Sequence, residues 1–305
     1  MTSGAPAVDV SGAGFAAAMA PTVEVIRTVT DGIKSASERH SNLPGLDSVA
    51  LRDLAAQESG TIVKPQEWDV PIGDAQTLGS VDLMAATDAA RCYGELFSGT
   101  RAPLYGHLTL ARACLEACVV SAWLSDPKIS PTERQRRALV ELIYSAKEVK
   151  RLGVEEGDIA DERIALWIGV ATELGWDVSK DTKPQVGGSG RPAMAAGIDQ
   201  LLIDKGPLRL GRVQWSYLSG VNHTVWFALK QAFIGDLTDD GMAPSTAPLG
   251  TESMSVYSQT LCLLRALRVA ATTRMTYMGW IDDEWEYAAN VGLTHEAELF
   301  RRVTA

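Results

Sequence analysis

The sequence predicts an all-α protein, folded as a single bundle or array of about nine to ten helices. Three observations predict it. Apolar residues recur with helical spacing along most of the chain, capping signals divide these stretches, and the alternation typical of strands is nearly absent. The chain has 305 residues, of which 46% are hydrophobic, enough to bury a sizeable core. We expect a flexible N-terminus at 1–12 and one helical domain at 13–305, with a central core at 104–281.

In the first third of the chain, helices are expected at 15–20, 22–39, 47–58 and 80–99. Pro21 should end or kink a helix, because proline removes a backbone donor and its ring clashes with the preceding turn. Asp47 or Ser48 can cap the third helix. Residues 59–79 carry prolines and glycines in loop-like order. We therefore expect a long loop there.

Further helices are expected at 104–125, 130–153, 161–174, 192–205, 210–234, 257–281 and 284–303. The clearest local signal is Ser130-Pro131-Thr132-Glu133, which matches a capping box with proline at the first helical position. Residues 176–190 are expected to form a polar, glycine-rich loop. Residues 235–255 are acidic, contain two prolines and are expected to form a mobile loop that can act as a lid.

Charge and cysteine content narrow the class of protein. The formal net charge of −10 disfavours general binding to nucleic acid or to anionic membranes. The helix at 130–152 has a local excess of basic residues, which we interpret as a solvated face. The four cysteines lie in apolar stretches without a Cys-x-x-Cys pair, and predict buried thiols in a cytoplasmic protein. We find no apolar run of membrane-spanning length and no signal peptide.

The stretch 104–124 is apolar on every side, which is typical of a buried helix. Arg112 and Glu116 nevertheless lie in its middle, one turn apart. Their order is the reverse of the one that best stabilises a surface helix, so we expect both to be buried and paired with polar groups on other helices. Two interpretations stay open: a structural ion pair, and a polar pocket inside the bundle.

A second polar pattern lies in the stretch 212–234. Arg212, Ser216, Ser219 and His223 follow helical spacing and form a stripe on one face. The stripe can face solvent, or it can join Glu116 across the bundle. In the second case His223 acts as a general acid or base, Glu116 orients it, and Ser219 lies beside it. A Ser-His-acid hydrolase is disfavoured, because no Gly-x-Ser-x-Gly elbow surrounds the serine.

Three further patterns are weaker. His107, Cys114 and Cys118 share one helical face, but a fourth zinc ligand is not evident, and we expect no metal site. The glycine-rich run 187–190 with Arg191 leads into a helix and is either an anion site or a flexible linker. Arg268 lies on an apolar helix, where it can add a cation to the pocket or pair with an acid.

An apolar helix carrying Arg112 and Glu116, followed by a helix with Ser219-Gly-Val-Asn-His223, resembles the organisation of HEPN-type helical domains across roughly 104–234. The resemblance implies an RNase or a nucleotide-binding module. Nuclease members of that family carry an arginine four to six residues before a histidine. Here Arg212 lies eleven residues before His223, so that motif is absent.

The sequence thus predicts a pocket for a small molecule or nucleotide, and it leaves catalysis open. The candidate catalytic residues are Glu116, Ser219 and His223. The candidate ligand-binding residues are Arg112, Arg191, Arg212 and Arg268. No cofactor is expected, and a homodimer is compatible with the sequence. The alternative function is a noncatalytic interaction or dimerisation protein whose buried ion pairs are purely structural.

Overall fold

The computed structural model describes residues 13–99, 106–153, 157–179, 183–202, 215–220 and 253–304. These residues are almost entirely helical, and the named strands among them form one short hairpin, which confirms the all-α prediction. Parts of the predicted helix at 210–234 and of the predicted lid at 235–255 lie outside the described residues. The last three residues of that predicted lid, 253–255, already belong to a helix.

Two of the first helices differ from the sequence prediction. The first helix, α1 (Ala13–Arg39), continues through Pro21, so of the two predicted effects of this proline, the end of a helix was wrong. Packing of this helix against its neighbours offsets the lost backbone hydrogen bond. The second helix, α2 (Val49–Glu58), starts as predicted, because the Ser48 hydroxyl accepts a hydrogen bond from the backbone amide of Leu51.

The third helix, α3 (Pro71–Leu96), begins well inside the predicted loop, with Pro71 in its first turn. Gly79, which suggested a loop, lies within the helix. A Cβ atom on this glycine would lie only 2.8 Å from the Ser125 hydroxyl oxygen. The glycine therefore permits a close approach between two segments rather than a turn, and the loop prediction for 71–79 was wrong.

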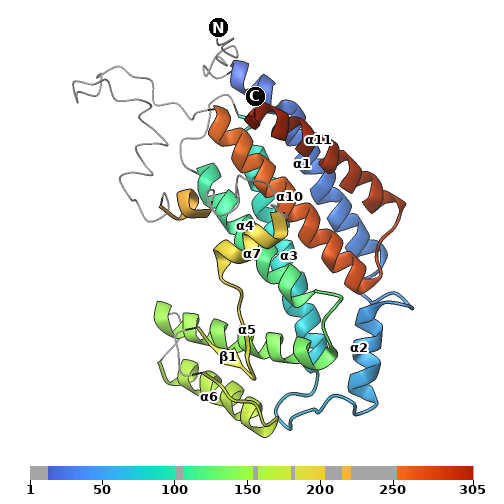
Figure 1. Ribbon diagram of the computed structural model, residues 1–305, viewed down its shortest axis with the longest axis vertical. Helices are drawn as coiled ribbons and strands as arrows, with labels where there is room; N and C mark the ends of the chain where they lie inside the picture. The colour runs from blue at the N-terminus through green and yellow to red at the C-terminus, as the bar shows by residue number, and fades with distance from the viewer. Residues whose placement is uncertain are drawn as a thin grey trace, which may run out of the picture.

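The central bundle combines α1 and α3 with α4 (Gly106–Leu124), α10 (Ser253–Met278) and α11 (Asp283–Thr304). Figure 1 shows these helices running along the long axis of the molecule, with α1 and α11 antiparallel to each other. The α4 helix packs between α3 and α10, while α11 packs against both α1 and α10. The start of α1 and the end of α11 consequently lie at the same end of the bundle (Figure 1).

A smaller group of elements lies across the lower end of the bundle in Figure 1. It contains α5 (Pro131–Leu152) and α6 (Gly157–Glu173), with a hairpin of β1 (Gln185–Val186) and β2 (Ser189–Gly190). The short helix α7 (Met194–Leu202) leads back to α4 and α10. The capping prediction for α5 is confirmed, because the Ser130 hydroxyl accepts from the Glu133 amide and Gly153 ends the helix with a φ of 63°.

Buried apolar side chains form two clusters. The larger cluster lies within the central bundle and includes Tyr93, Leu115 and Trp285. The smaller one joins α5, α6 and the hairpin around Leu139 and Val186. The end of α4 and the start of α5 lie between these two clusters.

The α4 helix is long and apolar enough to cross a membrane by length and composition, contrary to the sequence expectation, and 56% of that window is buried within the protein. Among the cysteines, Cys114, Cys118 and Cys262 are buried, as expected. Cys92 is exposed, so the prediction of four buried thiols was wrong at this position.

Candidate functional site

Arg112 and Glu116 form an ion pair with each other. The Arg112 Nε lies 2.8 Å from the Glu116 Oε1, and the two side chains are 21% and 39% exposed. The Arg112 guanidinium also lies 4.9 Å from the ring centre of Trp215. The prediction that both charges are buried and paired with polar groups on other helices was therefore wrong. The pair lies on one helix at partial exposure, where an aromatic ring from the segment 215–220 covers the cation.

The structure tests the predicted serine–histidine stripe only in part. Ser219 is half-buried in the helical segment 215–220, whereas Arg212 and His223 lie outside the described residues. The contact between Arg112 and Trp215 brings this segment against α4. A catalytic role for Glu116, Ser219 and His223 stays a prediction.

Arg191 binds a carboxylate. Its Nε lies 3.0 Å from the Glu141 Oε2, although the two atoms are not aligned for a hydrogen bond. The Arg191 guanidinium also stacks 4.0 Å from the ring centre of Tyr144. The predicted loop at 187–190 is part of a hairpin, whose two central residues, Gly187 and Gly188, have φ values of 53° and 83°. This run, for which the sequence left an anion site and a flexible linker as alternatives, is thus a tight turn followed by a paired arginine.

The same arginine lies in the electrostatic environment of two acids. Burial, together with the negative charge of Glu141, raises the pKa of Asp82 to about 7 against the opposing effect of Arg191. Burial also raises the pKa of Glu141, against the opposing effect of Arg191. Desolvation therefore dominates both shifts, and the three groups form a carboxyl–arginine cluster between α3, α5 and the segment after the hairpin.

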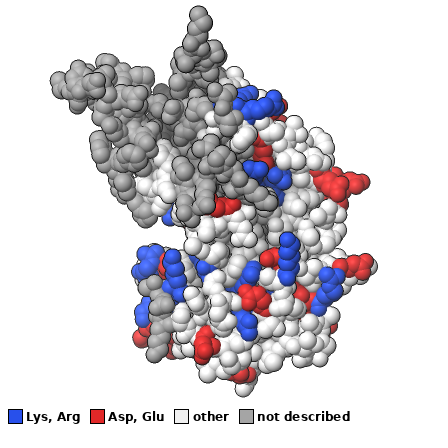
Figure 2. Space-filling model, viewed as in Figure 1, with Lys and Arg blue, Asp and Glu red and all other residues white. Residues whose placement is uncertain are grey.

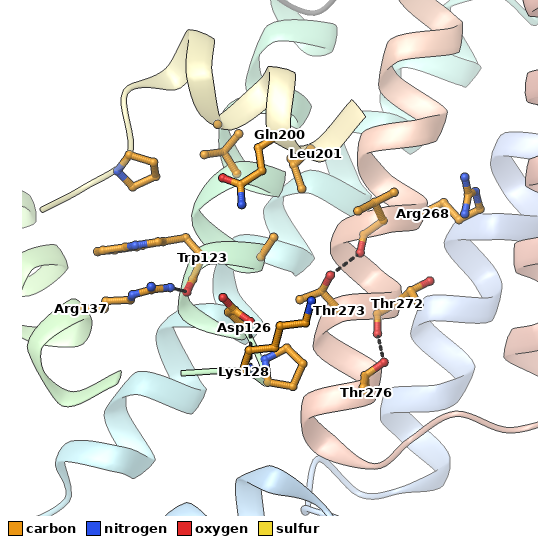
Figure 3. Close-up of a pocket in the computed structure, with 16 residues that line it drawn as sticks. Trp123, Asp126, Lys128, Arg137, Gln200, Leu201, Arg268, Thr272, Thr273 and Thr276 are labelled. Atoms are coloured by element: carbon orange, nitrogen blue, oxygen red, sulfur yellow. Dashed lines mark hydrogen bonds between the residues drawn. The ribbon is translucent and has the colours of Figure 1, made fainter. Parts of the chain in front are cut away.

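Arg268 forms a bidentate ion pair. Its Nε and Nη2 lie 2.6 and 3.0 Å from the two carboxylate oxygens of Glu296, which is buried. The pair joins α10 to α11. The aliphatic part of Arg268 lines the cavity described next, but Figure 3 shows the guanidinium pointing away from the other labelled side chains. Its charge therefore stabilises the contact between α10 and α11.

His107 is 1% exposed and packs edge-on against the ring of Phe97. Burial lowers its pKa to about 4, so the imidazole is neutral at pH 7. The Cys114 and Cys118 sulfurs are 4.0 Å apart, and no group of three potential metal ligands is found among the described residues.

A cavity with a volume of about 590 Å³ lies between α4, α5, α7 and α10. We call it the threonine cavity, after three hydroxyl-bearing residues of α10: Thr272, Thr273 and Thr276. Figure 3 shows the Thr273 side chain on the side of α10 that faces Asp126 and Trp123 across the cavity. Its volume lies in the range of small-molecule sites, roughly 300–1,000 Å³.

The cavity has an apolar wall and a polar wall. Val119, Trp123 and Leu201 contribute apolar surface. On the polar wall, the hydroxyl groups of Thr273 and Thr276 donate to the backbone carbonyls of the preceding turn of α10. Their oxygen lone pairs stay available to accept from a ligand.

Close packing holds α7 over the cavity. A Cβ atom on Gly197 would lie 2.5 Å from the Val119 Cγ1, so only glycine lets α7 approach α4 this closely. Gln200 and Leu201 on the same helix then face the threonines (Figure 3).

The basic residues of the cavity differ in their partners. Arg137 donates to the Trp123 carbonyl at 2.6 Å and to Glu133 at 3.0 Å. Lys128 is exposed, and among the described residues no carboxylate lies within 4.0 Å of its ammonium group. Lys128 therefore supplies the cavity with a positive charge that the described residues do not neutralise.

Sequence reasoning missed most of this cavity. Of the predicted site residues that the structure describes, only Arg268 lines it; Arg112, Glu116, Arg191 and Ser219 do not. The one local signal was the run of small hydroxyl residues at Thr272, Thr273 and Thr276, unusual within a long apolar helix. Comparisons with family models, with curated proteins and with solved structures find no match.

Proposed function

We propose that this protein binds a phosphate-bearing small molecule of nucleotide size in the threonine cavity. The observation that carries the proposal is the ammonium group of Lys128, which no described carboxylate neutralises, beside a cavity with hydroxyl groups on one wall. An unpaired cation favours an anion, and the apolar wall at Trp123 and Leu201 favours a ligand with a larger, less polar body.

Binding rather than catalysis is the function that the described lining supports. Asp126 is the single carboxylate among the described lining residues, and no histidine is among them. The Asp126 carboxylate accepts a hydrogen bond from the Lys128 backbone amide at 3.0 Å, which orients the segment that carries the lysine. The HEPN resemblance implies RNase activity or nucleotide binding, but the arginine–histidine motif of the family's nucleases is absent from this sequence. Arg212 and His223 lie outside the described residues.

Calorimetric titration with AMP and ATP tests the proposal. We expect binding by the natural protein and at least about a tenfold weaker affinity in Lys128→Met, because a charge-assisted contact is lost. Thr272→Val should weaken binding less, since it removes one hydroxyl at constant shape. Lys64→Met, at an exposed lysine outside the cavity, is the matched control and should bind normally. Absence of binding at millimolar nucleotide, or equal affinity in Lys128→Met, would refute the proposal.

The alternative, a noncatalytic dimerisation protein in the cytoplasm, draws support from a different observation. The ion pair of Arg268 with Glu296 is buried and links helices, as a purely structural pair would. Light scattering at several protein concentrations tests this alternative. A stable dimer that binds none of the nucleotides favours it, whereas a nucleotide-binding monomer excludes it.

A further inference from the structure

A second arginine of α10 is buried without a carboxylate partner. Arg274 is 2% exposed, and its Nη1 and Nη2 donate to the hydroxyl oxygens of Ser125 and Ser80 at 3.3 and 2.6 Å. In the part of the chain that the structure describes, its Nε has no hydrogen-bond partner and no carboxylate lies within 4.0 Å of the guanidinium. Two neutral hydroxyls thus provide its hydrogen-bond acceptors.

Such a cation is energetically unfavourable. Burial lowers the pKa of Arg274 to about 10, which still leaves it charged at pH 7. The nearby Arg134 adds to the unfavourable field, although Arg134 itself is neutralised by Asp53 at 2.7 Å. A buried charge normally persists only when it is paired, so Arg274 requires an anion that the described residues do not supply.

Arg274 is one of the residues that line a cavity of about 380 Å³ between α1, α3 and α10. We call it the arginine cavity. Its apolar walls come from five residues: Ile33, Leu83, Met84, Met275 and Trp280. The charged groups that line it besides Arg274 are Lys34, Glu38, Asp88 and Arg91.

These other charges are more exposed and partly paired. Lys34 lies 3.7 Å from Glu38, and both side chains are largely exposed. Arg91 pairs with Asp31 at 3.6 Å, while Asp88 is exposed. The cavity therefore combines one buried cation, an apolar wall and a solvated rim of both signs.

The position of Arg274 is built into the packing of its neighbours. A Cβ atom on Gly79 would lie 2.8 Å from the Ser125 hydroxyl oxygen and 3.3 Å from the Arg274 Nη1. The glycine thus leaves room for the serine and the guanidinium together. Ser80 is the next residue on the same turn of α3. Its hydroxyl oxygen accepts the hydrogen bond from the Arg274 Nη2, and the residue also lines the cavity.

We propose that the arginine cavity is a second ligand site, which binds an organic monocarboxylate through Arg274 and holds its apolar body against Leu83, Met275 and Trp280. A guanidinium binds a carboxylate with planar, charge-assisted hydrogen bonds, and the ligand supplies the missing negative charge. This site is separate from the threonine cavity and shares none of its lining residues.

The test compares octanoate with its neutral analogue octanamide by calorimetry on the full chain. We expect octanoate to bind at least about tenfold more tightly than octanamide, because only the carboxylate pairs with the cation. Arg274→Met should abolish this preference. Lys64→Met, which removes an exposed cation outside both cavities, is the matched control and should change octanoate affinity by less than about twofold.

Two further variants separate the outcomes. Thr87→Trp fills the arginine cavity from α3 and should block octanoate even if Arg274→Met does not fold. Lys128→Met should leave octanoate binding unchanged, and Arg274→Met should leave nucleotide binding unchanged. These two variants therefore show separately whether the arginine cavity binds octanoate and whether the threonine cavity binds nucleotide. The proposal is overturned if octanoate does not bind, if octanamide binds equally well, or if Thr87→Trp binds octanoate normally.

Discussion

Arg134 illustrates how a buried cation is satisfied in this fold. Its side chain is 0% exposed, and its Nε donates to the Asp53 Oδ2 at 2.7 Å. Its other nitrogens donate to the backbone carbonyls of Leu124 and Asp126. The guanidinium also stacks 3.9 Å from the ring centre of Tyr277. The sequence interpretation of the basic residues at 130–152 as a solvated face was therefore wrong for Arg134. This arginine of α5 is buried among groups from α2, the end of α4 and α10.

The first prediction compares two arginine–carboxylate pairs. Asp53→Ala should lower the free energy of unfolding by about 3–5 kcal/mol, because it leaves Arg134 buried without its counter-ion. Glu116→Ala should lower it by less than about 1 kcal/mol, because its pair with Arg112 is half-exposed and Trp215 still covers the arginine. Urea unfolding measures both values. Equal losses for the two variants would contradict this ranking of buried and half-exposed pairs.

The second prediction concerns pH. Burial raises the pKa of Asp82 from 3.8 to about 7, so the folded protein holds this proton more tightly than the unfolded chain does. The contribution of Asp82 to stability is therefore full below its ordinary pKa and is lost as the pH rises through about 7. Asp82→Asn removes this dependence. Relative to the natural protein, the variant should gain stability between pH 5 and pH 8 in urea unfolding.

The variant must be compared with the natural protein, because His107 changes the free energy of unfolding with pH in the direction opposite to Asp82. Its pKa is lowered to about 4, so its contribution is present above its ordinary value of 6.5 and is lost as the pH falls through about 4. Subtracting the two unfolding curves cancels this effect, since His107 is present in both proteins. A difference that stays constant from pH 5 to pH 8 would show that the Asp82 proton does not affect folding.

At the scale of elements, the sequence predicted helices where local signals and packing agree. The cap at Ser130 and the left-handed Gly153 mark both ends of α5 within one residue of the prediction. The start of α3 was missed because Gly79 serves a tertiary contact, which local propensity does not reveal. The hairpin was missed because its strands are two residues long and show no alternation.

The third prediction tests the contact that places α7 over the threonine cavity. Gly197→Ala should destabilise the protein by about 1–3 kcal/mol, because the added methyl group overlaps Val119. Val119→Ala makes room for that methyl group, so the double variant should be more stable than the sum of the two single changes predicts. Urea unfolding of the four proteins completes this double-mutant cycle. Additive changes would show that α7 does not pack on α4 at this point.

At the scale of the whole molecule, the candidate sites depend on segments far apart in the sequence. The threonine cavity draws its walls from 119–137, 192–201 and 268–276, and the arginine cavity draws on α1, α3 and α10. Helical periodicity places a residue on a face of its own helix but leaves the pairing of helices open. This is why the fold class was predictable from sequence, whereas both cavities and the lone charge of Arg274 required the tertiary structure.

The last prediction concerns the charge of the molecule as a whole. The formal net charge is −10, and Figure 2 shows acidic and basic side chains interspersed over much of the visible face. Basic side chains gather at the C-terminal end of α5, where Lys150 and Arg151 lie in the last turn. Both are paired with acids, at 2.5 Å to Asp161 and 2.8 Å to Glu148. This small, neutralised cluster does not provide the row of free cations that phosphate backbones require.

We therefore expect no micromolar binding to arbitrary duplex DNA or single-stranded RNA in fluorescence anisotropy at low salt. A positively charged DNA-binding protein serves as the control for the assay. Lys150→Glu with Arg151→Glu should leave the signal unchanged, because there is no general binding to remove. Binding that weakens steeply with added salt, and that this double variant abolishes, would instead identify the end of α5 as an electrostatic surface for nucleic acid. Nucleotide binding in the threonine cavity is independent of this result, since neither residue lines that cavity.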